Sequence, residues 1–389
     1  SFIFITSSCS KTLPGAPEEN LLLDGPIEGL TTEQQIQFLK GDVAFNDDIF
    51  TVEKGLGPIF NANSCATCHA GDGKGHPFIG FTRFGQTDAT GNKFLNQGAP
   101  QLQNKAIPGY TPETLPAGAT FSNLLAPAVT GLGLLDAVSD ADLIALSDPN
   151  DTNNDGISGV PHWNNIPEYA KAQLRPNTII NGGKYITRFG KKGAAYNLLQ
   201  QTSEAYNQDM GVASIFEAID TYSGLEIDPE VATDQVNDVV FYLKTLKAPL
   251  RRDETNADVI EGEKLFSEMK CASCHSPTLQ TGPSTIEALS NKTFHPYTDL
   301  LLHDMGALLD DGYTEGFALT SEWKTPALWG LGLSQDSQGG SYFLMHDGRA
   351  KSIEDAILLH GGEALQSKNS YKQLMESKKQ QVLKFLESL

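Results

Sequence analysis

The sequence has no long hydrophobic run and little positive charge. Its 389 residues contain no uninterrupted stretch of about 18 apolar residues, which excludes a membrane-spanning helix within the chain as given. Lys and Arg total 28 against 48 Asp and Glu, a formal charge of −20, and this balance argues against nucleic acid as a partner. The apolar share of 39% and the charged share of 20% indicate a folded chain of two or three domains.

Cysteine is also scarce, and four of the five cysteines lie in two strings of one form, CATCH and CASCH. C-x-x-C-H is the attachment pattern of c-type haem: two thiols add to the haem vinyl groups, and the adjacent histidine becomes the proximal iron ligand. A redox dithiol, half of a zinc site and structural cysteines are the alternatives, but a redox dithiol does not need the following histidine. We therefore expect two covalently bound c-type haems, held by Cys65, Cys68, His69, Cys271, Cys274 and His275.

The fifth cysteine, Cys9, bears on localisation. Covalent haem attachment in bacteria takes place outside the cytoplasm, so we expect a periplasmic or otherwise extracytoplasmic protein. The residues from Phe2 to Ser8 are typical of the end of a signal sequence, and Cys9 is the candidate lipidated anchor of a lipoprotein. Thr6 stands where a branched aliphatic residue is usual, and a plain secretory signal or a free surface thiol are the alternatives.

Three landmarks occur twice along the chain. Segments beginning at Gly57 and Gly262 lead into the two haem motifs, with Phe60 and Phe266 within five residues of the first cysteine, and each is predicted to be the first helix of a cytochrome c fold. PAVTGLGL and PALWGLGL follow the first cysteine of each motif by 62 and 55 residues and are identical at six of eight positions. Apolar residues spaced i, i+3, i+4, i+7 predict a closing amphipathic helix ending at Leu246 and another at the C-terminus.

The repeats predict an all-α protein built from tandem cytochrome c-like haem domains. Residues 1–20 form a signal remnant and linker, 21–250 the N-terminal haem domain and 251–389 the C-terminal haem domain. The first unit is longer by 63 residues, and we place this long, loop-rich insertion between Asp136 and Met210. Within it, Asp151, Asn153 and Asp155 form an oxygen-rich loop suited to a structural Ca²⁺, with a plain Asx-rich turn as the alternative.

The second axial ligand determines which haem reacts. Iron with two strong ligands only passes electrons, whereas iron with an open site can bind peroxide. Met345, twelve residues beyond PALWGLGL, is the predicted second ligand of the C-terminal haem, with Met305 as the runner-up and a core methionine as the alternative. Because no methionine occurs between the first motif and Met210, the N-terminal haem is predicted to be the reactive one.

Peroxide cleavage also needs a group that moves a proton between the two oxygens. The candidates are Asp136, Glu113 near Gln103, and His76, each of which could equally be a capping or solvated residue. Two arginines are candidates for holding haem propionates, and three tryptophans for relaying electrons, although surface and core roles are the alternatives for them: Arg188, Arg349, Trp163, Trp323 and Trp329.

These strings resemble a known group of enzymes. KTPALWGLGL and MHDGRAKSIEDAILLHGGEA are similar to the bacterial di-haem cytochrome c peroxidase superfamily, and YTDLLLHDMG with GLGLLDAV resembles its branch called di-haem oxidoreductase, putative peroxidase. The resemblance runs from about Gly55 to the C-terminus. It implies a peroxide-reacting N-terminal haem, a His/Met electron-transfer haem at Met345, and a dimer. Two departures are that the first unit lacks a D-G-R string and that Lys191 stands where the branch usually has tryptophan.

Together these features predict a di-haem enzyme that reduces hydrogen peroxide at the N-terminal haem with electrons relayed through the C-terminal haem. The alternatives are an oxidase of an organic or protein substrate, acting through a high-valent di-haem state, and a non-catalytic electron carrier. A small basic cytochrome c or copper protein is the expected electron donor for a surface of charge −20.

Overall fold

The computed structural model describes residues 17–88 and 91–389, so Cys9 lies outside the described residues. The fold is mixed rather than all-α, with 36% of residues helical and 13% in strands. The predicted all-α class is therefore wrong. The strands are only two to four residues long, too short for an alternating pattern to stand out in the sequence, and they pair into several small sheets.

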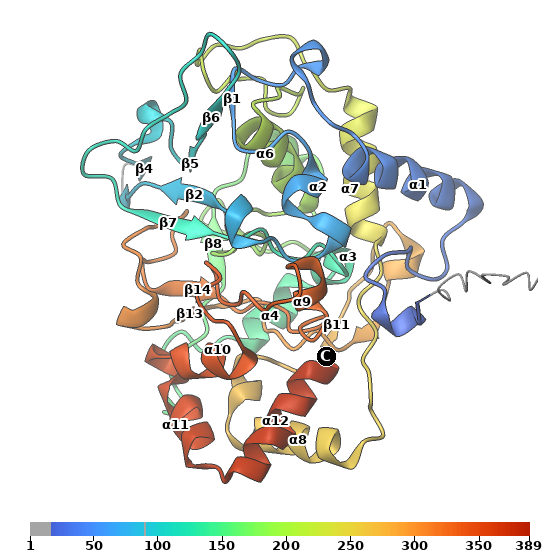
Figure 1. Ribbon diagram of the computed structural model, residues 1–389, viewed down its shortest axis with the longest axis vertical. Coiled ribbons are helices and arrows are strands. Elements are labelled where there is room, and N and C mark those ends of the chain that lie inside the picture. Colours follow the sequence, from blue (N-terminus) through green and yellow to red (C-terminus); the bar gives the residue numbers. More distant parts are fainter. Residues whose placement is uncertain (1–16, 89–90) are drawn as a thin grey trace, which may run out of the picture.

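The helices cluster at the two ends of the molecule, around the first and last helix of each half (Figure 1). The α-helices are α1 (Thr32–Asn46), α2 (Cys65–Cys68), α3 (Leu132–Asp136), α4 (Asp140–Leu146), α5 (Glu168–Lys171), α6 (Leu198–Met210), α7 (Thr233–Thr245), α8 (Ala257–Glu268), α9 (Ser334–Ser337), α10 (Ile353–Leu359), α11 (Leu365–Gln373) and α12 (Glu376–Ser388). Short 3₁₀ turns connect them, among them η6 (Cys271–Ser273).

The strands form two sheets of three strands and four of two, all antiparallel. The three-stranded sheets have the orders β5-β2-β7 and β8-β10-β9. Their bounds are β1 (Ile59–Phe60), β2 (Phe81–Phe84), β3 (Thr87–Asp88), β4 (Gly91–Asn92), β5 (Gln101–Leu102), β6 (Lys105–Ala106), β7 (Phe121–Leu124), β8 (His162–Asn164), β9 (Ile180–Asn181), β10 (Lys184–Thr187), β11 (Leu279–Gln280), β12 (Thr293–Phe294), β13 (Leu302–Asp304) and β14 (Glu322–Lys324).

Two helix pairs repeat the same packing. Helix α1 crosses α7 in the upper part of Figure 1, and α8 lies against α12 at the lower end. A glycine allows each close approach: a Cβ atom added at Gly41 would lie 2.1 Å from the Asp238 carbonyl oxygen, and one added at Gly262 would lie 2.0 Å from that of Gln381. Both contacts are far shorter than van der Waals distance, so neither position tolerates a side chain without separating its helices.

The repeated strings PAVTGLGL and PALWGLGL make the same packing contact in both halves of the chain. A Cβ atom added at Gly133 would lie 1.8 Å from the carbonyl oxygen of Lys244 on α7, and one added at Gly332 would lie 1.9 Å from that of Glu387 on α12. Each repeat therefore packs its backbone against the closing helix of its own unit. The predicted closing helices are confirmed as α7 and α12, with their apolar residues buried.

The helix expected before the first haem motif is placed differently. Residues Ala257–Glu268 do form a helix leading into Cys271, but Gly57 precedes strand β1, which pairs with β6. The true counterpart of α8 in the first unit is α1, where Gly41 and Phe45 match the spacing of Gly262 and Phe266. About twenty residues therefore separate Phe45 from the first motif, against five in the second unit.

The main apolar core draws on both halves of the chain. It joins α1, α6 and α7 to residues beyond 250, including Leu279, Phe294 and Leu301, while a second core surrounds α8 and α12. Backbone bridges also link Val160 with Leu302. The proposed boundary at 250 separates the two helix pairs along the chain and stays a prediction.

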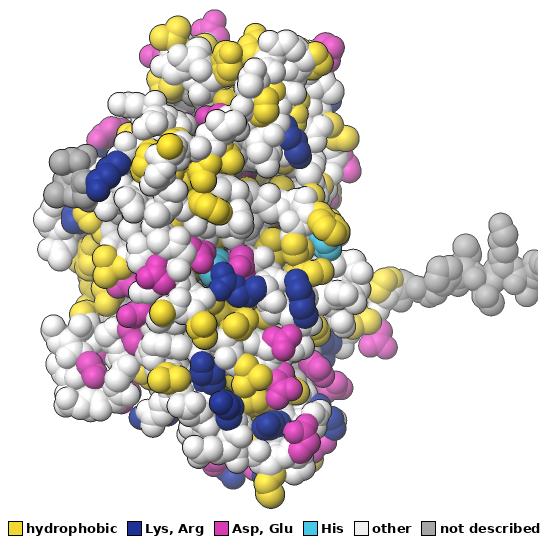
Figure 2. Space-filling model, turned by 60° about the vertical axis from the view of Figure 1, so that its left-hand side comes forward, with side chains coloured by type: hydrophobic (Ala, Val, Ile, Leu, Met, Phe, Trp, Pro, Cys, Tyr) yellow, Lys and Arg dark blue, Asp and Glu magenta, His cyan; other side chains and the backbone are white. Residues whose placement is uncertain are grey.

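Charge is distributed over the surface rather than gathered at one place on the face in view. Acidic and basic side chains are intermixed on the face that Figure 2 shows, with apolar side chains between them. Among the described residues, no helix has both the length and the apolar character needed to cross a membrane.

The close approach of α8 and α12 leads to a stability prediction. Replacing Gly262 by Ala gains helix propensity but forces a Cβ atom into the Gln381 backbone, so we expect a net loss of about 1–3 kcal/mol in unfolding free energy. Gly282→Ala is the control, since its added Cβ atom meets nothing nearer than 3.7 Å and should change stability by less than about 0.5 kcal/mol. Chemical denaturation measures both; equal effects would contradict the packing account.

Candidate functional site

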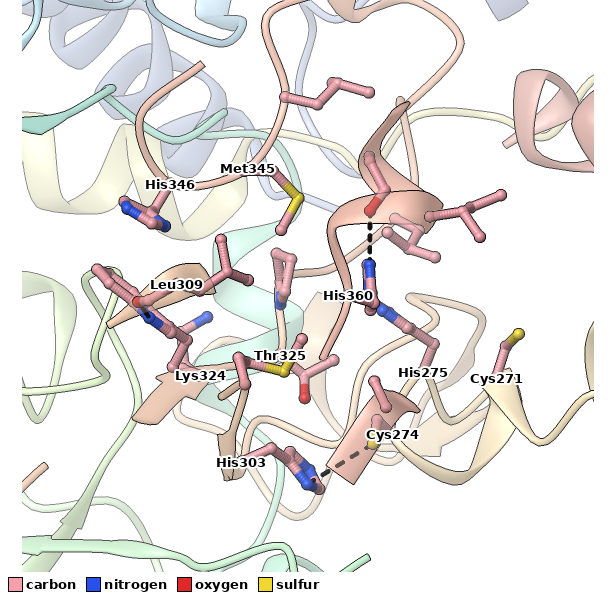
Figure 3. Close-up of a pocket in the computed structure, with 18 of the residues that line it drawn as sticks. Cys271, Cys274, His275, His303, Leu309, Lys324, Thr325, Met345, His346 and His360 are labelled. Atoms are coloured by element: carbon pink, nitrogen blue, oxygen red, sulfur yellow. Dashed lines mark hydrogen bonds between the residues drawn. The ribbon is translucent and has the colours of Figure 1, made fainter. Parts of the chain in front are cut away.

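Among the described residues, the C-terminal C-x-x-C-H motif borders a cavity with a volume of about 250 Å³. Helix α8 delivers the chain to η6, which carries Cys271, and His275 follows at the cavity wall. Figure 3 shows the motif on one side of this cavity and the loop with Met345 and His346 on the other.

The cysteines of this motif form no disulfide, and its thiols and imidazole are neutral. Cys271 and Cys274 are free thiols, and burial raises the pKa of Cys271 to about 12 and that of Cys274 above its ordinary value. Burial, with a smaller effect from His360, lowers the pKa of His275 to about 4. A neutral imidazole has a free lone pair, the form in which histidine binds metals.

A second imidazole faces His275 across the cavity wall. The rings of His275 and His360 have centroids 6.5 Å apart and planes inclined at 52°. Nδ1 of His275 donates to the Tyr297 carbonyl oxygen at 3.0 Å, and Nδ1 of His360 donates to that of Ala356 at 2.7 Å. Both rings are therefore held by the backbone through the same nitrogen, which leaves both Nε2 atoms for another partner.

A buried charged network supports this wall. His303 donates from Nε2 to Asp299 at 2.8 Å and from Nδ1 to Glu363 at 2.7 Å, and Cys274 Sγ lies 3.6 Å from the same Nδ1. The carboxylates outweigh burial and raise the pKa of His303 to about 12, so the ring carries a proton. The paired His303 lowers the pKa of Glu363 to about 2 despite its burial. The network fixes the chain directly after His360.

Both predicted thioether ligands line the same cavity from its other side. Met345 and Met305 pack against the apolar cluster of Leu124, Leu309 and Trp323. Next to Met345, the ring of His346 stacks on Trp323 at 3.9 Å and donates from Nε2 to Asp311 at 2.8 Å. His346 is thus held away from the iron-binding role, while Met345 stays a candidate.

Three lysines from distant segments also face this cavity: Lys74, Lys191 and Lys324. Burial and their mutual repulsion lower the pKa of Lys191 to about 7, and burial lowers those of Lys74 and Lys324 to about 8. None of the three ammonium groups forms a hydrogen bond or ion pair with another described residue. Three half-buried lysines without an acidic partner indicate a place for anionic groups.

The N-terminal motif is built from α2, whose Ser64 side chain accepts the Thr67 backbone N–H. Burial is the main cause that raises the pKa values of Cys65 and Cys68 to about 12 and lowers that of His69 to about 4. Among the described residues, the only aromatic ring in contact with His69 is Phe45, with centroids 5.8 Å apart. Within the described part of the chain, no second imidazole is in ring contact with this histidine.

A polar segment lies beside the first motif. The side chain of Gln101 donates to Asp209, whose negative charge contributes to the raised thiol pKa values of the motif. Gln103 donates from Nε2 to the Gln208 carbonyl oxygen at 2.9 Å, and its backbone N–H donates to Glu113 at 2.7 Å. Burial raises the pKa of Glu113. Glu113 is therefore connected, through Gln103, to the segment around Asp209 that lies beside the N-terminal motif.

The other predicted acid, Asp136, is already in an ion pair. Its carboxylate lies 3.2 Å from Arg175 and 3.9 Å from Lys244, and the residue is only 8% exposed. It does not line the cavity. His76 accepts the Phe78 N–H and contacts Phe343, at the surface rather than at either motif.

The arginines named in the sequence have other partners. Arg188 is fully buried, donates to the Val138 carbonyl oxygen and pairs with Asp140. Arg349 is exposed and pairs with Asp347. Of the tryptophans, Trp323 lines the cavity, whereas the other two pack on the main core: Trp163 and Trp329.

The predicted calcium loop uses its oxygens internally. Asp151 accepts the N–H of Asp155 at 2.9 Å and of Gly156, and Asn153 also accepts the Asp155 N–H at 2.9 Å. Asp155 accepts the Ile157 N–H at 3.0 Å. These contacts are those of Asx turns, and calcium binding stays a prediction.

Sequence reasoning missed several residues that the structure brings together. His360 stands in the HGGEA string, where its place at the end of a short helix before two glycines was a signal that it is held in position. The lysines carried no signal of their own, since they come from three separate segments. Lys191 stood out only as a departure from tryptophan.

The comparison with protein families identifies the chain. Residues 122–389 match the family described as "Di-haem oxidoreductase, putative peroxidase". This segment spans more than half of the sequence, and the chain belongs to this family. The protein is therefore a di-haem oxidoreductase, with haem as its cofactor. The comparison with curated proteins gave no match.

Solved structures with a distant likeness cover nearly the whole chain. A MauG-like protein associated with microbial copper homeostasis is 13% identical, with a TM-score of 0.41 and coverage of 95% of this chain and 93% of that one. The diheme peroxidase BthA from Burkholderia thailandensis is 14% identical, with a TM-score of 0.41 and coverage of 97% and 94%. Hydrazine synthase from Kuenenia stuttgartiensis is 13% identical, with a TM-score of 0.40 and full coverage of both chains.

The residues around the cavity fit a haem. Free thiols stand at the spacing of the two vinyl groups, and His275 offers a neutral ring with an uncommitted Nε2. The three unpaired lysines would meet the anionic propionates, which every haem carries. At the first motif, Nδ1 of the buried His69 has no hydrogen-bond partner, and both thiols are free.

A buried acid near the first motif leads to a pH prediction. Asp72 accepts a hydrogen bond from Tyr242 at 2.6 Å, and burial raises its pKa to about 6 from 3.8. The folded protein binds this proton more tightly than the unfolded chain, so the stabilising effect is complete below pH 3.8 and is lost as the pH rises through about 6. Asp72→Asn should therefore become more stable relative to wild type over this range, by on the order of 2–3 kcal/mol.

Urea unfolding at several pH values measures this difference. Asp228→Asn, at an exposed position, is the control and should show no such trend. A pH-independent difference between Asp72→Asn and the wild type would contradict the buried-acid account.

The lysines lead to a prediction about reduction potential. Replacing Lys324, Lys191 or Lys74 by Met removes a positive charge beside the cavity. Without that charge, the reduced state of a haem bound there is less stable. The potential of the haem at this cavity should fall by a few tens of millivolts, on the order of 1 kcal/mol or less. Spectroelectrochemical titration measures it, with the exposed Lys264→Met as control. Unchanged potentials in all three variants would show that the lysines do not face the haem.

Proposed function

We propose that this di-haem oxidoreductase reduces hydrogen peroxide at the N-terminal haem and receives electrons through the C-terminal haem. The observation that carries the proposal is the unequal surroundings of the two proximal histidines. His275 faces a second imidazole, and two thioethers line the same cavity, whereas among the described residues Phe45 is the only aromatic ring in contact with His69. A filled iron site suits electron transfer, and an open one suits peroxide binding.

Both haems are proposed to be attached covalently through the thiols of the two motifs. When bound, haem supplies an iron that takes up electrons one at a time and can bind a peroxide oxygen. The chain's own contribution is to hold each imidazole neutral and to surround the thiols with apolar residues. The half-buried positions of His69 and His275 support this role, because desolvation lowers the pKa of both rings to about 4 and keeps them unprotonated.

Glu113 is the proposed proton carrier. Reduction of one peroxide molecule to two water molecules consumes two electrons and two protons, and a nearby carboxyl group with a raised pKa can supply and take back a proton. Burial raises the pKa of Glu113, and its contact with the Gln103 backbone connects it to the segment beside the first motif. Asp136 is less suited, because its charge is held by Arg175.

The remaining proposals concern the surroundings of the enzyme. Electrons are proposed to come from a small basic cytochrome c or copper protein, which the charge of −20 would attract. The need for haem attachment supports an extracytoplasmic location, with Cys9 as a lipid anchor. A homodimer is proposed from the family resemblance.

Rapid mixing of the matured, half-reduced protein with hydrogen peroxide tests the proposed function. We expect rapid loss of a high-spin haem signal and oxidation of a supplied donor by two electrons per peroxide. Glu113→Gln should lower the rate about 10²–10⁴-fold, because the carboxamide has no proton to transfer. Glu230→Gln is the matched control, since Glu230 also accepts a backbone N–H and has its pKa raised by burial.

Two outcomes would contradict the proposal. If both haems stay low-spin and peroxide only bleaches them slowly, the protein is an electron carrier. If the two glutamine variants are slowed equally, Glu113 is not the proton carrier. Asp136→Asn should lower the unfolding temperature through loss of its ion pair without a comparable loss of rate.

A further inference from the structure

We propose that His360 is the second axial ligand of the C-terminal haem, in place of the predicted Met345. The inference rests on the proposed attachment of a haem at Cys271 and Cys274. It changes the expected iron site from His/Met to His/His.

The distance between the two rings fits one metal ion between them. Metal–imidazole bonds are about 2 Å long, so two imidazoles on opposite sides of one ion have centroids about 6 Å apart. The centroids of His275 and His360 are 6.5 Å apart. Other ring pairs in contact have similar spacings, such as Phe266 and His275 at 6.2 Å, so the spacing admits an ion and the orientation of the two rings carries the assignment.

Both rings also have the orientation of metal ligands. Metal-binding histidines usually donate the other ring N–H to a carbonyl or carboxylate, which sets the tautomer. His275 donates from Nδ1 to the Tyr297 carbonyl oxygen, and His360 donates from Nδ1 to that of Ala356. Each Nε2 therefore carries the lone pair, and neither has a hydrogen-bond partner among the described residues. In Figure 3 the two rings lie next to each other, on the side of the cavity that carries Cys274.

The residues after His360 hold it in this place. A Cβ atom at Gly362 would lie 2.1 Å from the Asp304 carbonyl oxygen, so the chain here packs directly on the end of β13. Glu363 then accepts from the Ser158 hydroxyl at 2.6 Å and from His303 at 2.7 Å. The position of His360 is thus set by helix α10 on one side and by a buried network on the other.

Met345 is held on another side of the cavity. It packs with Leu309 and Trp323 and against the core around α8 and α12, and its neighbour His346 is stacked on Trp323. Figure 3 shows Met345 on the loop that carries His346, apart from the His275–His360 pair. Its backbone φ of +68° is rare for a side chain of this kind, so the contacts around the loop must hold Met345 in this conformation.

The ligand change has a consequence for electron transfer. A thioether ligand raises the reduction potential of a c-type haem. A His/His iron has a lower potential and is therefore a stronger reductant for a partner haem than a His/Met iron.

Spectroscopy of the matured protein tests the assignment without relying on turnover. Ferric wild-type protein should show a low-spin electron paramagnetic resonance signal and lack the sulfur-to-iron charge-transfer band of thioether ligation. His360→Ala should convert one haem per chain from low to high spin, and added imidazole should restore it. Met345→Ala, the matched control from the same cavity, should leave the low-spin signal unchanged.

Two further measurements keep the result decisive. His360→Met should make the thioether band appear if this position reaches the iron, and haem content confirms that each variant is loaded. A thioether band in the wild type that Met345→Ala removes, or a low-spin signal that survives His360→Ala, would overturn the assignment of His360 as the second ligand. Neither result would affect the proposed function. Absence of haem at the Cys271–Cys274 motif would instead overturn the attachment on which the proposed function rests.

Discussion

The close packing of a glycine on one helix against the backbone of another is the constraint on which both halves of this protein depend. Gly41 brings α1 onto α7, and Gly262 brings α8 onto α12. The repeated G-x-G-L strings then seat a second backbone segment on each closing helix. Because such contacts leave no room for a side chain, each helix pair has one register. That register places the chain after α8 at the cavity wall.

The two haem motifs share this scaffold but differ in what surrounds them. His275 faces His360 within a wall held by His303 and its two carboxylates. His69 stands beside Phe45 and near a polar segment that ends in a buried carboxyl group. The proposed attachment chemistry therefore meets two different environments, and the proposed division of labour between the irons rests on the side chains around the motifs rather than on the motifs themselves.

The positive charge beside the cavity is the second feature that ties the two halves together. Lys74 comes from the N-terminal motif region, Lys191 from the insertion and Lys324 from β14. Burial of three unpaired ammonium groups is unfavourable unless an anion compensates for it. In a chain of net charge −20, such a cluster indicates that the site was built for negatively charged groups.

The sequence was a good guide to periodic and covalent features and a poor one to contacts between distant segments. The spacing of Val236, Val239 and Val240 predicted α7 correctly, because a helix of 13 residues contains several turns of the pattern. Strands of two to four residues contain too little alternation, so the all-α prediction failed. The first helix of the N-terminal unit was misplaced because about twenty residues separate Phe45 from its motif.

The candidate site was predicted in part for the same reason: its residues that are adjacent in the sequence were found, and its contacts between distant segments were not. The two motifs were evident, since all their functional residues are adjacent in the chain. His360 lies 85 residues beyond His275, and only the folded chain brings the two rings together. Glu113 and Gln103 were noted as neighbours, but the ion pair of Asp136 with Arg175 depends on the fold.

The most direct test of the central claim is the spin state of the two haems in the matured protein as purified. Quantitative electron paramagnetic resonance of the ferric protein should give one high-spin and one low-spin centre per chain, because the proposal places an open site at His69 and a second ligand opposite His275. Two low-spin centres in equal amount, with no high-spin signal, would contradict the account and leave an electron carrier.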